Sequence, residues 1–211
     1  MLLSIRHRTR YAYDPPAAAV AMRLKLFPSV FEGQRTESWR VTVNGRETPP
    51  EFADSWGDAG ATAILRGGAE AVEIVAEGRV LTTDAAGVLR GHREAIRPGV
   101  CMRATPRTKW SDAVAALARE AEGETDLARA HALRDLVADR VVYKPGSTHH
   151  ATSAEEALAA GEGVCQDQAH VMIAAARSLG WPARYVVGYY LPSPDGLDDA
   201  ATHAWAELWL E

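Results

Sequence analysis

The stretch Gly161-Glu-Gly-Val-Cys165-Gln-Asp-Gln-Ala-His170 decides the fold of the second half of this chain. Gly163 interrupts the chain just before Cys165, and apolar residues then recur at helical spacing from the cysteine. These residues are Ala169, Met172, Ile173, Ala176 and Leu179. Gly180 and Pro182 end the pattern. The sequence therefore predicts a helix of about four turns that begins at Cys165.

Cys165 is a candidate nucleophile because of this position. Unpaired backbone N–H groups and the positive end of the dipole favour a thiolate in the first turn of a helix. By position alone, a small buried cysteine that only packs at a helix start is an equal alternative. The same N–H groups are natural donors to an oxyanion, and the adjacent Gln166 is a candidate for shaping the site.

Two strands with alternating apolar residues follow this helix, at 183–191 and 203–210. In the second strand the aliphatic residues fall on one face. The other face carries His203, Trp205, Glu207 and Trp209. His203 therefore opens a strand, opposite the aliphatic stripe. A cysteine at a helix start and a histidine at a strand start can meet across a helix–sheet interface, as a Cys–His nucleophile and base require.

Three blocks of this region carry a family resemblance. They are Gly-Val-Cys165-Gln-Asp-x-Ala-His170, Leu179-Gly-Trp-Pro-Ala-Arg-Tyr-Val-Val-Gly-Tyr189 and Thr202-His203-Ala-Trp-Ala-Glu207. Together they resemble the core of bacterial transglutaminase-like proteins, which share a papain-like Cys–His–Asp arrangement. The opening, with Ile5-Arg-His7-Arg-Thr9-Arg-Tyr11-Ala-Tyr13 and Asp54-Ser-Trp-Gly57, is similar to the β-rich N-terminal domain of that family.

The resemblance covers nearly the whole chain and implies an α+β fold. Residues 1–95 are expected to form an antiparallel β domain. Residues 96–211 are expected to form a papain-like, transglutaminase-like core with helices packed on an antiparallel sheet. The resemblance makes Cys165 the nucleophile and His203 its base.

The resemblance also implies an aspartate on the strand after His203, and the sequence ends at Glu211, before such a strand. We therefore expect an incomplete core with reduced activity. Glu207 shares the His203 face but lies four residues along the strand, ~13 Å away and too far for a hydrogen bond. Asp198 and Asp199, in the preceding loop, could fold back.

Other residues near the cysteine have weaker claims. His170 lies about 140° around the helix from Cys165, which predicts a partly buried histidine held by hydrogen bonds. Tyr143 is a candidate for the edge of the site, with a core aromatic residue as the alternative. The pair His149-His150 is typical of a solvated loop. No zinc-ligand spacing is present, so neither a metal nor a cofactor is expected.

Composition excludes several classes of protein. The net charge is −5, from 23 basic and 28 acidic residues, with no basic run that would indicate a nucleic-acid partner. Two distant cysteines, Cys101 and Cys165, favour a reducing compartment without disulfides. The N-terminus lacks a signal segment, and no stretch is long and apolar enough for a membrane. We therefore expect a cytoplasmic protein.

The first 95 residues read as short strands separated by Gly-rich turns, which suggests a sandwich or two packed sheets. The expected strands are 2–13, 17–26, 34–43, 51–56, 61–65 and 72–81. Residues 83–98 are expected to form a linker. Helices are predicted at 112–122, 126–142 and 154–160, with Ser111, Thr125 and Ser153 as their N-caps.

The function that these residues favour is a cysteine peptidase or amidase that works through an acyl-enzyme. A protein-glutamine transglutaminase and a non-catalytic binding or scaffold module are the alternatives. The substrate is expected to be a protein, a peptide or a small amide. A homodimer is also possible through the strand at 203–210 if it is an unprotected edge.

Overall fold

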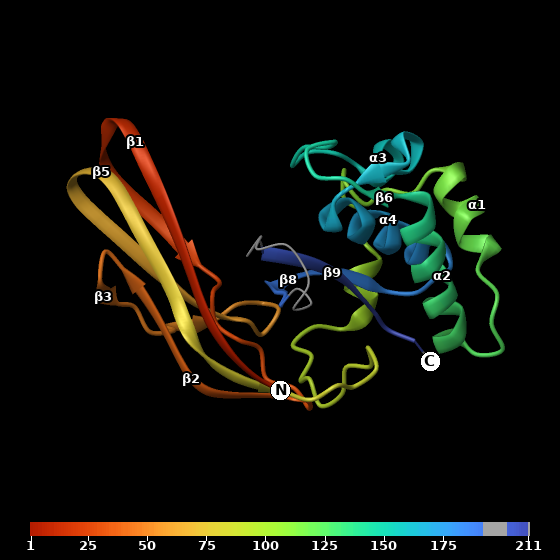
Figure 1. Cartoon of the computed structure of the whole chain (residues 1–211), viewed down its shortest axis with the longest axis horizontal. Helices are drawn as coiled ribbons and strands as arrows, with labels where there is room; N and C mark the ends of the chain where they lie inside the picture. Colours follow the sequence, from red (N-terminus) through yellow and green to blue (C-terminus); the bar gives the residue numbers. More distant parts are fainter. Residues whose placement is uncertain (192–201, 211) are drawn as a thin grey trace. The chain divides into compact units, whose positions relative to one another are not determined.

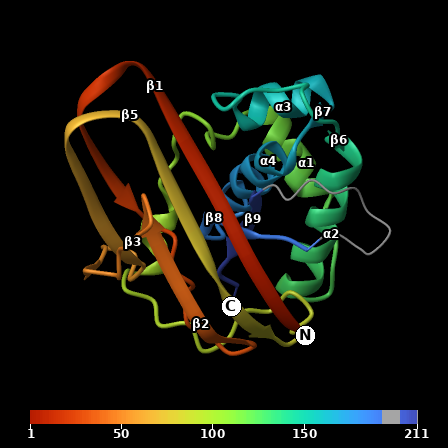
Figure 2. The ribbon, with the colours of Figure 1, turned by 60° about the vertical axis from the view of Figure 1, so that its left-hand side comes forward.

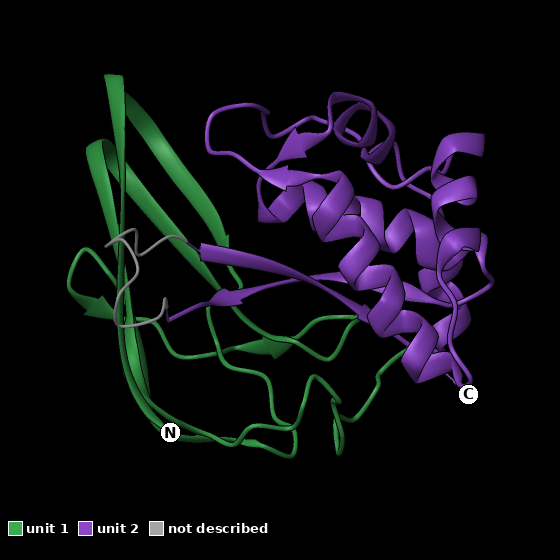
Figure 3. Cartoon of the chain, turned by 45° about the vertical axis from the view of Figure 1, so that its right-hand side comes forward, with its two compact units in different colours: residues 1–96 green, residues 97–211 purple. Residues whose placement is uncertain are grey.

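The computed structural model describes residues 1–191 and 202–210. It divides into two compact units, Met1–Ile96 and Arg97–Glu211 (Figure 3). The first unit is an antiparallel sheet, and the second packs helices on a pair of antiparallel strands. The predicted α+β class is therefore confirmed. No helix within the described ranges is both long enough and apolar enough to cross a membrane.

Two very long strands dominate the first unit. β1 (Leu2–Leu24) pairs with β5 (Ala59–Thr82) along nearly its whole length, and the two run side by side in both views (Figure 1; Figure 2). β5 also pairs with β2 (Gln34–Val43) and with β4 (Phe52–Ala53). β3 (Arg46–Glu47) completes the order β1-β5-β2-β3.

The expectation of many short strands was wrong for β1 and β5. Each was predicted as two strands, divided at Pro15-Pro16 and at Gly67-Gly68. In the structure these residues lie where the ladder is irregular, with register shifts between Ala12 and Ala19. Gly67 and Gly68 have φ values of 90° and 88°, which glycine adopts without strain. The residues taken as breaks therefore distort a continuous ladder, as β-bulges do.

The core of the first unit uses both halves of this ribbon. Val20 and Leu24 from the end of β1 share a cluster with Val72 and Ile74 from the second half of β5. Val41 of β2 is also part of this core. In residues 1–96, all of which are described, one five-stranded sheet with bent long strands replaces the expected pair of sheets.

The second unit begins with η1 (Pro98–Met102) and contains four α-helices. They are α1 (Asp112–Glu120), α2 (Asp126–Arg140), α3 (Ala154–Ala160) and α4 (Cys165–Ser178). The three predicted N-caps are confirmed, because Ser111, Thr125 and Ser153 accept hydrogen bonds from backbone N–H groups of their own helices.

α4 is the centre of the second unit. It packs against α1, α2 and α3 and also against β8 (Ala183–Tyr189) and β9 (Thr202–Leu208). Nine of its residues are buried, so the helix is covered on most of its surface. The small side chains of Ala174, Ala175 and Ala176 let its neighbours approach closely. A rigid central helix therefore carries Cys165 at its first position.

Candidate active site

Cys165 begins α4 and is half-buried. The preceding residue, Val164, is extended and forms the N-cap. The N–H groups of Asp167 and Gln168 donate to the Val164 carbonyl at 2.9 and 3.1 Å. The N–H groups of Cys165 and Gln166 come before these bonds and have no acceptor within the helix. The predicted placement of the thiol in a helical first turn is confirmed.

Asp167 fixes this turn, and the sequence-based interpretation missed it. Its carboxylate is fully buried. Oδ2 accepts the Val164 N–H at 2.8 Å and the Thr148 hydroxyl at 2.5 Å. An acidic residue at the third position of a predicted helix is a known cap signal, and it could have identified Asp167. Its bond to Thr148 has no comparable signal in the sequence.

Tyr143 lies beside the segment that leads to Cys165. β6 (Val142–Tyr143) pairs in parallel with β7 (Glu162–Gly163), and this pairing puts Tyr143 opposite Gly163. The Lys144 N–H donates to the Gly163 carbonyl at 2.7 Å. Tyr143 is 58% exposed, so its alternative interpretation as a core aromatic residue was wrong. His149 follows in the loop between β6 and α3, with its ring 6.1 Å from that of His150.

His203 lies at the same end of the α4–sheet layer as Cys165. Two contacts show that α4 and β8 run antiparallel: Arg177 with Ala183, and His170 with Tyr185. Cys165 precedes Arg177 by 12 residues (177 minus 165), or ~18 Å of helix. Gly188, the β8 partner of His203, follows Ala183 by 5 residues (188 minus 183), or ~17 Å of strand. The candidate nucleophile and the candidate base are therefore level along the layer.

Cys165 and His203 lie on opposite sides of the β8–β9 pair, because α4 packs on one face of the pair and the His203 side chain is on the other. Tyr185 lies on the face that meets α4, with its ring 5.3 Å from that of His170. Side chains alternate along a strand, so His203 points to the other face. There its ring lies 5.0 Å from Tyr190 and 4.7 Å from Trp205. The structure brings Cys165 and His203 to one end of the layer without a hydrogen bond between them. Partial burial lowers the pKa of His203.

His170 and Tyr185 form a second pair next to the cysteine. Burial lowers the pKa of His170, and the nearby charge of Asp167 partly opposes this shift. Burial also raises the pKa of Tyr185, and the charges of Cys165 and Asp167 raise it further. Tyr185 is therefore within electrostatic reach of the thiol, which the sequence did not suggest. His170 is more buried than predicted, and its Nδ1 has no hydrogen-bond partner among the described residues.

The acids considered as partners of His203 are placed as follows. Glu207 forms an ion pair with Arg184, so its exclusion as the orienting acid agrees with its position. Asp198 and Asp199 lie outside the described residues. Across residues 1–191 and 202–210, no group of three or more His, Cys, Asp or Glu side chains is arranged to hold a metal ion.

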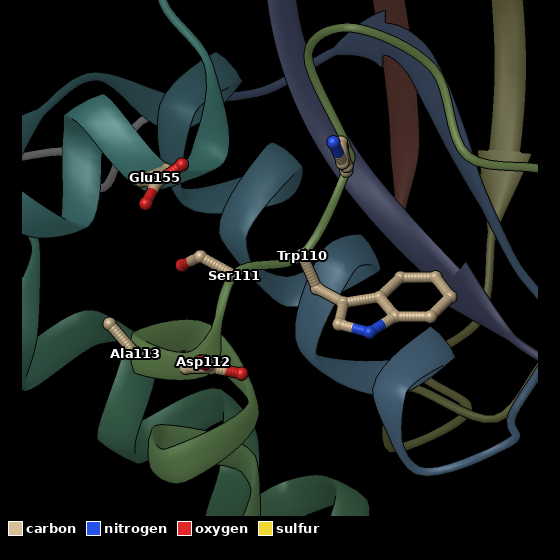
Figure 4. A pocket seen from close by; sticks show the side chains of 6 residues that line it. Trp110, Ser111, Asp112, Ala113 and Glu155 are labelled. Atoms are coloured by element: carbon tan, nitrogen blue, oxygen red, sulfur yellow. The ribbon is translucent and has the colours of Figure 1, made fainter.

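A hollow of about 500 Å³ lies at the beginnings of α1 and α3 (Figure 4). Residues 109–113 and Glu155 line it, and the close view shows Trp110, Ser111 and Asp112 along one stretch with Glu155 across from them. None of the candidate site residues lines this hollow.

A half-buried cysteine that opens a central helix, packed on antiparallel strands of which one carries a histidine, defines the class as papain-like α+β. Family models agree with this class. The transglutaminase-like superfamily matches residues 114–211, and the bacterial transglutaminase-like N-terminal region matches residues 3–81. The chain belongs to the bacterial transglutaminase-like family.

Relatives and solved structures extend this finding. The chain is 27% identical to an uncharacterised protein of Mycobacterium leprae, over 98% of this chain and 79% of that protein. It is 46% identical over 88 residues to an uncharacterised protein of Mycobacterium tuberculosis, a match to 36% of this chain and only 27% of that protein. The fold resembles a candidate cysteine protease from Cytophaga hutchinsonii, with a TM-score of 0.70 and 21% identity, over 100% of this chain and 75% of that one.

Proposed function

We propose that the chain is a thiol enzyme that cleaves amide bonds through an acyl-enzyme, with Cys165 as nucleophile and His203 as base. One observation carries the proposal. The half-exposed thiol of Cys165 lies in the first turn of α4, beside two backbone N–H groups that have no acceptor in the helix. These features favour a thiolate and supply donors for an oxyanion.

The reaction would proceed in two stages, acylation of Cys165 and hydrolysis of the resulting thioester. His203 takes the thiol proton as the Cys165 sulfur forms a bond to the amide carbonyl carbon. The carbonyl oxygen gains the negative charge and accepts hydrogen bonds from the N–H groups of Cys165 and Gln166. The C–N bond then breaks, and the leaving amine takes the proton from His203. Water attacks the thioester with His203 as base, which releases a carboxylic acid and restores the thiol.

The proposal requires a movement of the backbone at His203 as well as of its side chain, because side-chain rotation alone cannot carry the ring to the other face of a strand. The ring must leave the Tyr190–Trp205 face and turn round the end of β9 toward the thiol. The position permits this, because only the Thr202–Tyr189 pair separates His203 from the end of the ladder. Catalytic hydrogen bonds are often long or poorly aligned in free enzymes and tighten in the substrate complex.

The acceptor in the second stage separates a hydrolase from a transglutaminase. We assign water, so that the substrate is an amide of a protein, a peptide or a small molecule. A primary amine that became covalently joined to the acyl group in place of water would reassign the protein as a transglutaminase.

The proposal is tested by the rate at which iodoacetamide alkylates Cys165 as a function of pH. The mass of the peptide that contains Cys165 reports this rate without a contribution from Cys101. We expect fast alkylation well below the ordinary thiol pKa of about 8.5. His203→Ala should return the profile to that of an ordinary thiol, and His150→Ala, a change in an exposed loop of the same unit, should not.

An ordinary thiol profile that is indifferent to His203→Ala would overturn the proposal. The chain would then be a binding or scaffold module that keeps the fold without the chemistry.

A further inference from the structure

The carboxylate of Asp167 joins two segments that are distant in sequence: the turn before Cys165 and the loop at 144–152. We infer that Asp167 and Thr148 are positioning residues, which hold the thiol-bearing turn and fasten this loop beside it. The consequence for catalysis rests on the proposed function of Cys165. The mechanical part of the inference does not.

The hydrogen bonds place Asp167 next to the nucleophile without contact to a reacting group. Oδ2 accepts the N–H of Val164, the residue directly before Cys165, at 2.8 Å. This bond fixes the backbone as it enters α4. The same oxygen accepts the Thr148 hydroxyl at 2.5 Å. One atom therefore holds the turn and the loop together.

The surroundings of Asp167 are built for this carboxylate. A Cβ at Gly163 would lie 2.7 Å from the Asp167 Cβ and 2.9 Å from Oδ2, so any larger residue would displace the acid. Asp167 is fully buried, and its Oδ1 has no hydrogen-bond partner in the described structure. A buried carboxylate is costly unless it is compensated, here by the helix N-terminus and two hydrogen bonds. Asp167 is therefore better explained as a residue that positions the turn before Cys165 than as one that stabilises the fold.

The loop has a second neighbour one helical turn further along. The backbone of Thr152 acts on the ring of His170, which follows Asp167 by three residues on α4, and partly opposes the lowering of the His170 pKa. Asp167 and His170, which lie on the same face of the helix, therefore both face this loop. By contrast, the hydroxyl of Ser147 donates to Lys144 within the loop, at 2.8 Å. The Thr148–Asp167 bond is the attachment nearest to the thiol.

An effect of the Asp167 charge and an effect of its positioning bonds would change the reactivity of Cys165 in opposite directions when Asp167 is replaced. A negative carboxylate near Cys165 disfavours the thiolate, so removal of the charge alone would make the thiol more reactive at low pH. Loss of the positioning bonds would make it less reactive at every pH. Asp167→Ala removes both bonds together with the charge, whereas Asn could keep both bonds through its one oxygen. The sign of the change in Asp167→Ala therefore identifies the role.

The first experiment is amide hydrogen exchange on the full chain, read at residues 147–152 and at Val164. Thr148→Val removes the hydroxyl and keeps the shape, and it should speed exchange at both places by about tenfold. Thr148→Ser keeps the hydroxyl and should stay within about twofold of the wild type, as should the matched control Ser147→Ala. Gly163→Ala, which displaces the same carboxylate sterically, should reproduce the effect of Thr148→Val.

The second experiment is alkylation of Cys165 in Asp167→Ala, for which we expect about a tenfold lower rate across the pH range. Unchanged exchange in both Thr148→Val and Gly163→Ala would overturn the inference, and so would faster alkylation of Asp167→Ala at low pH. Exchange does not depend on a reactive thiol. A loosened loop in Thr148→Val, together with ordinary reactivity of Cys165 in the wild type, would keep the positioning role and reject the proposed enzyme.

Discussion

Arg184 and Glu207 face each other across β8 and β9, and the guanidinium Nε and Nη2 lie 2.8 and 2.7 Å from one carboxylate oxygen. The Arg184 guanidinium also lies over the ring of Trp209, 4.7 Å from its centroid. Both charged side chains are partly buried, at 15% and 28% exposure. The acid that shares a face with His203 is therefore engaged in holding the two strands together.

Replacement of Glu207 should affect stability and leave the thiol unchanged. We expect Glu207→Ala to lower the free energy of unfolding by about 1–2 kcal/mol, because a partly buried guanidinium loses its partner. Glu207→Gln keeps one hydrogen-bond acceptor and should cost less. Urea denaturation measures the loss. A shift in the pH profile of Cys165 alkylation in either variant would instead connect Glu207 to His203.

Arg177 should be one of the most sensitive positions in the second unit. Its buried guanidinium donates to the Thr108 hydroxyl at 2.7 Å and to the Ala183 carbonyl at 2.8 Å. Arg177→Met leaves both acceptors without this donor, so we expect a loss of about 2–4 kcal/mol in denaturation. Arg119 is a matched control, because it is exposed and its Nε donates to the Ala115 carbonyl of its own helix. A similar loss in Arg119→Met would contradict this assignment.

His170 should make stability depend on pH. Its pKa is lowered in the folded protein, so the folded state binds fewer protons than the unfolded state just below the ordinary value of about 6.5. This contribution is complete above about pH 6.5 and is lost as the pH falls toward the folded-state pKa, by at most about 1.4 kcal/mol per pH unit.

Thermal unfolding between about pH 7.5 and 5.5 measures this dependence. We expect His170→Gln to lose less stability over this range than the wild type. The exposed His150→Gln serves as the control and should follow the wild type. Equal losses in His170→Gln and the wild type would show that other groups cause the dependence.

Gly78 should not tolerate a side chain. It lies in β5 between Ile5 of β1 and Trp39 of β2, and a Cβ there would overlap the Ser38 carbonyl oxygen and lie 2.7 Å from the Trp39 ring. We expect Gly78→Ala to cost about 3 kcal/mol through overpacking.

Gly67, in the same strand, provides a comparison that distinguishes the cost of steric overlap from the cost of backbone strain. It has open space around its Cβ position but a φ of 90°. Gly67→Ala should therefore cost only about 1–2 kcal/mol, measured by the same urea denaturation. Equal effects of the two changes would mean that packing around Gly78 relaxes.

Local chemistry made the helices predictable. Ser111, Thr125 and Ser153 each satisfy backbone N–H groups of the next few residues, so a short window of sequence contains the whole interaction. The helical start at Cys165 followed in the same way from Gly163 and the apolar spacing after it.

The long strands could not be predicted in this way. Whether Pro15-Pro16 breaks or bends β1 depends on β5, whose Ala69 pairs with Ala17 from 52 residues away (69 minus 17) and which holds both halves in one ladder.

In the candidate site, too, features set by local sequence pattern were predictable and contacts between distant segments were not. Alternation in β9 correctly separated His203 from the aliphatic face, and the structure packs α4 on that aliphatic face. The expectation that Cys165 and His203 meet came from the helix and strand pattern and from the resemblance, and it stays a prediction. The Thr148–Asp167 bond and the approach of Tyr185 to the thiol join segments that no spacing rule connects.

The pairing of β1 with β5 sets the order in which the first unit can form. Leu2 lies opposite Leu81, and Leu24 lies opposite Ala61. During synthesis the beginning of β1 is therefore separated from its partner by more residues than the end of β1 is. On a ribosome, the alternating residues of β1 leave the exit tunnel well before β5 is made. That strand then presents unpaired backbone until about 80 residues have been added, which makes folding slow and exposes an edge to association. The arginines at positions 6, 8 and 10 put positive charge along this waiting strand and oppose its self-pairing until Glu73 and Glu77 arrive.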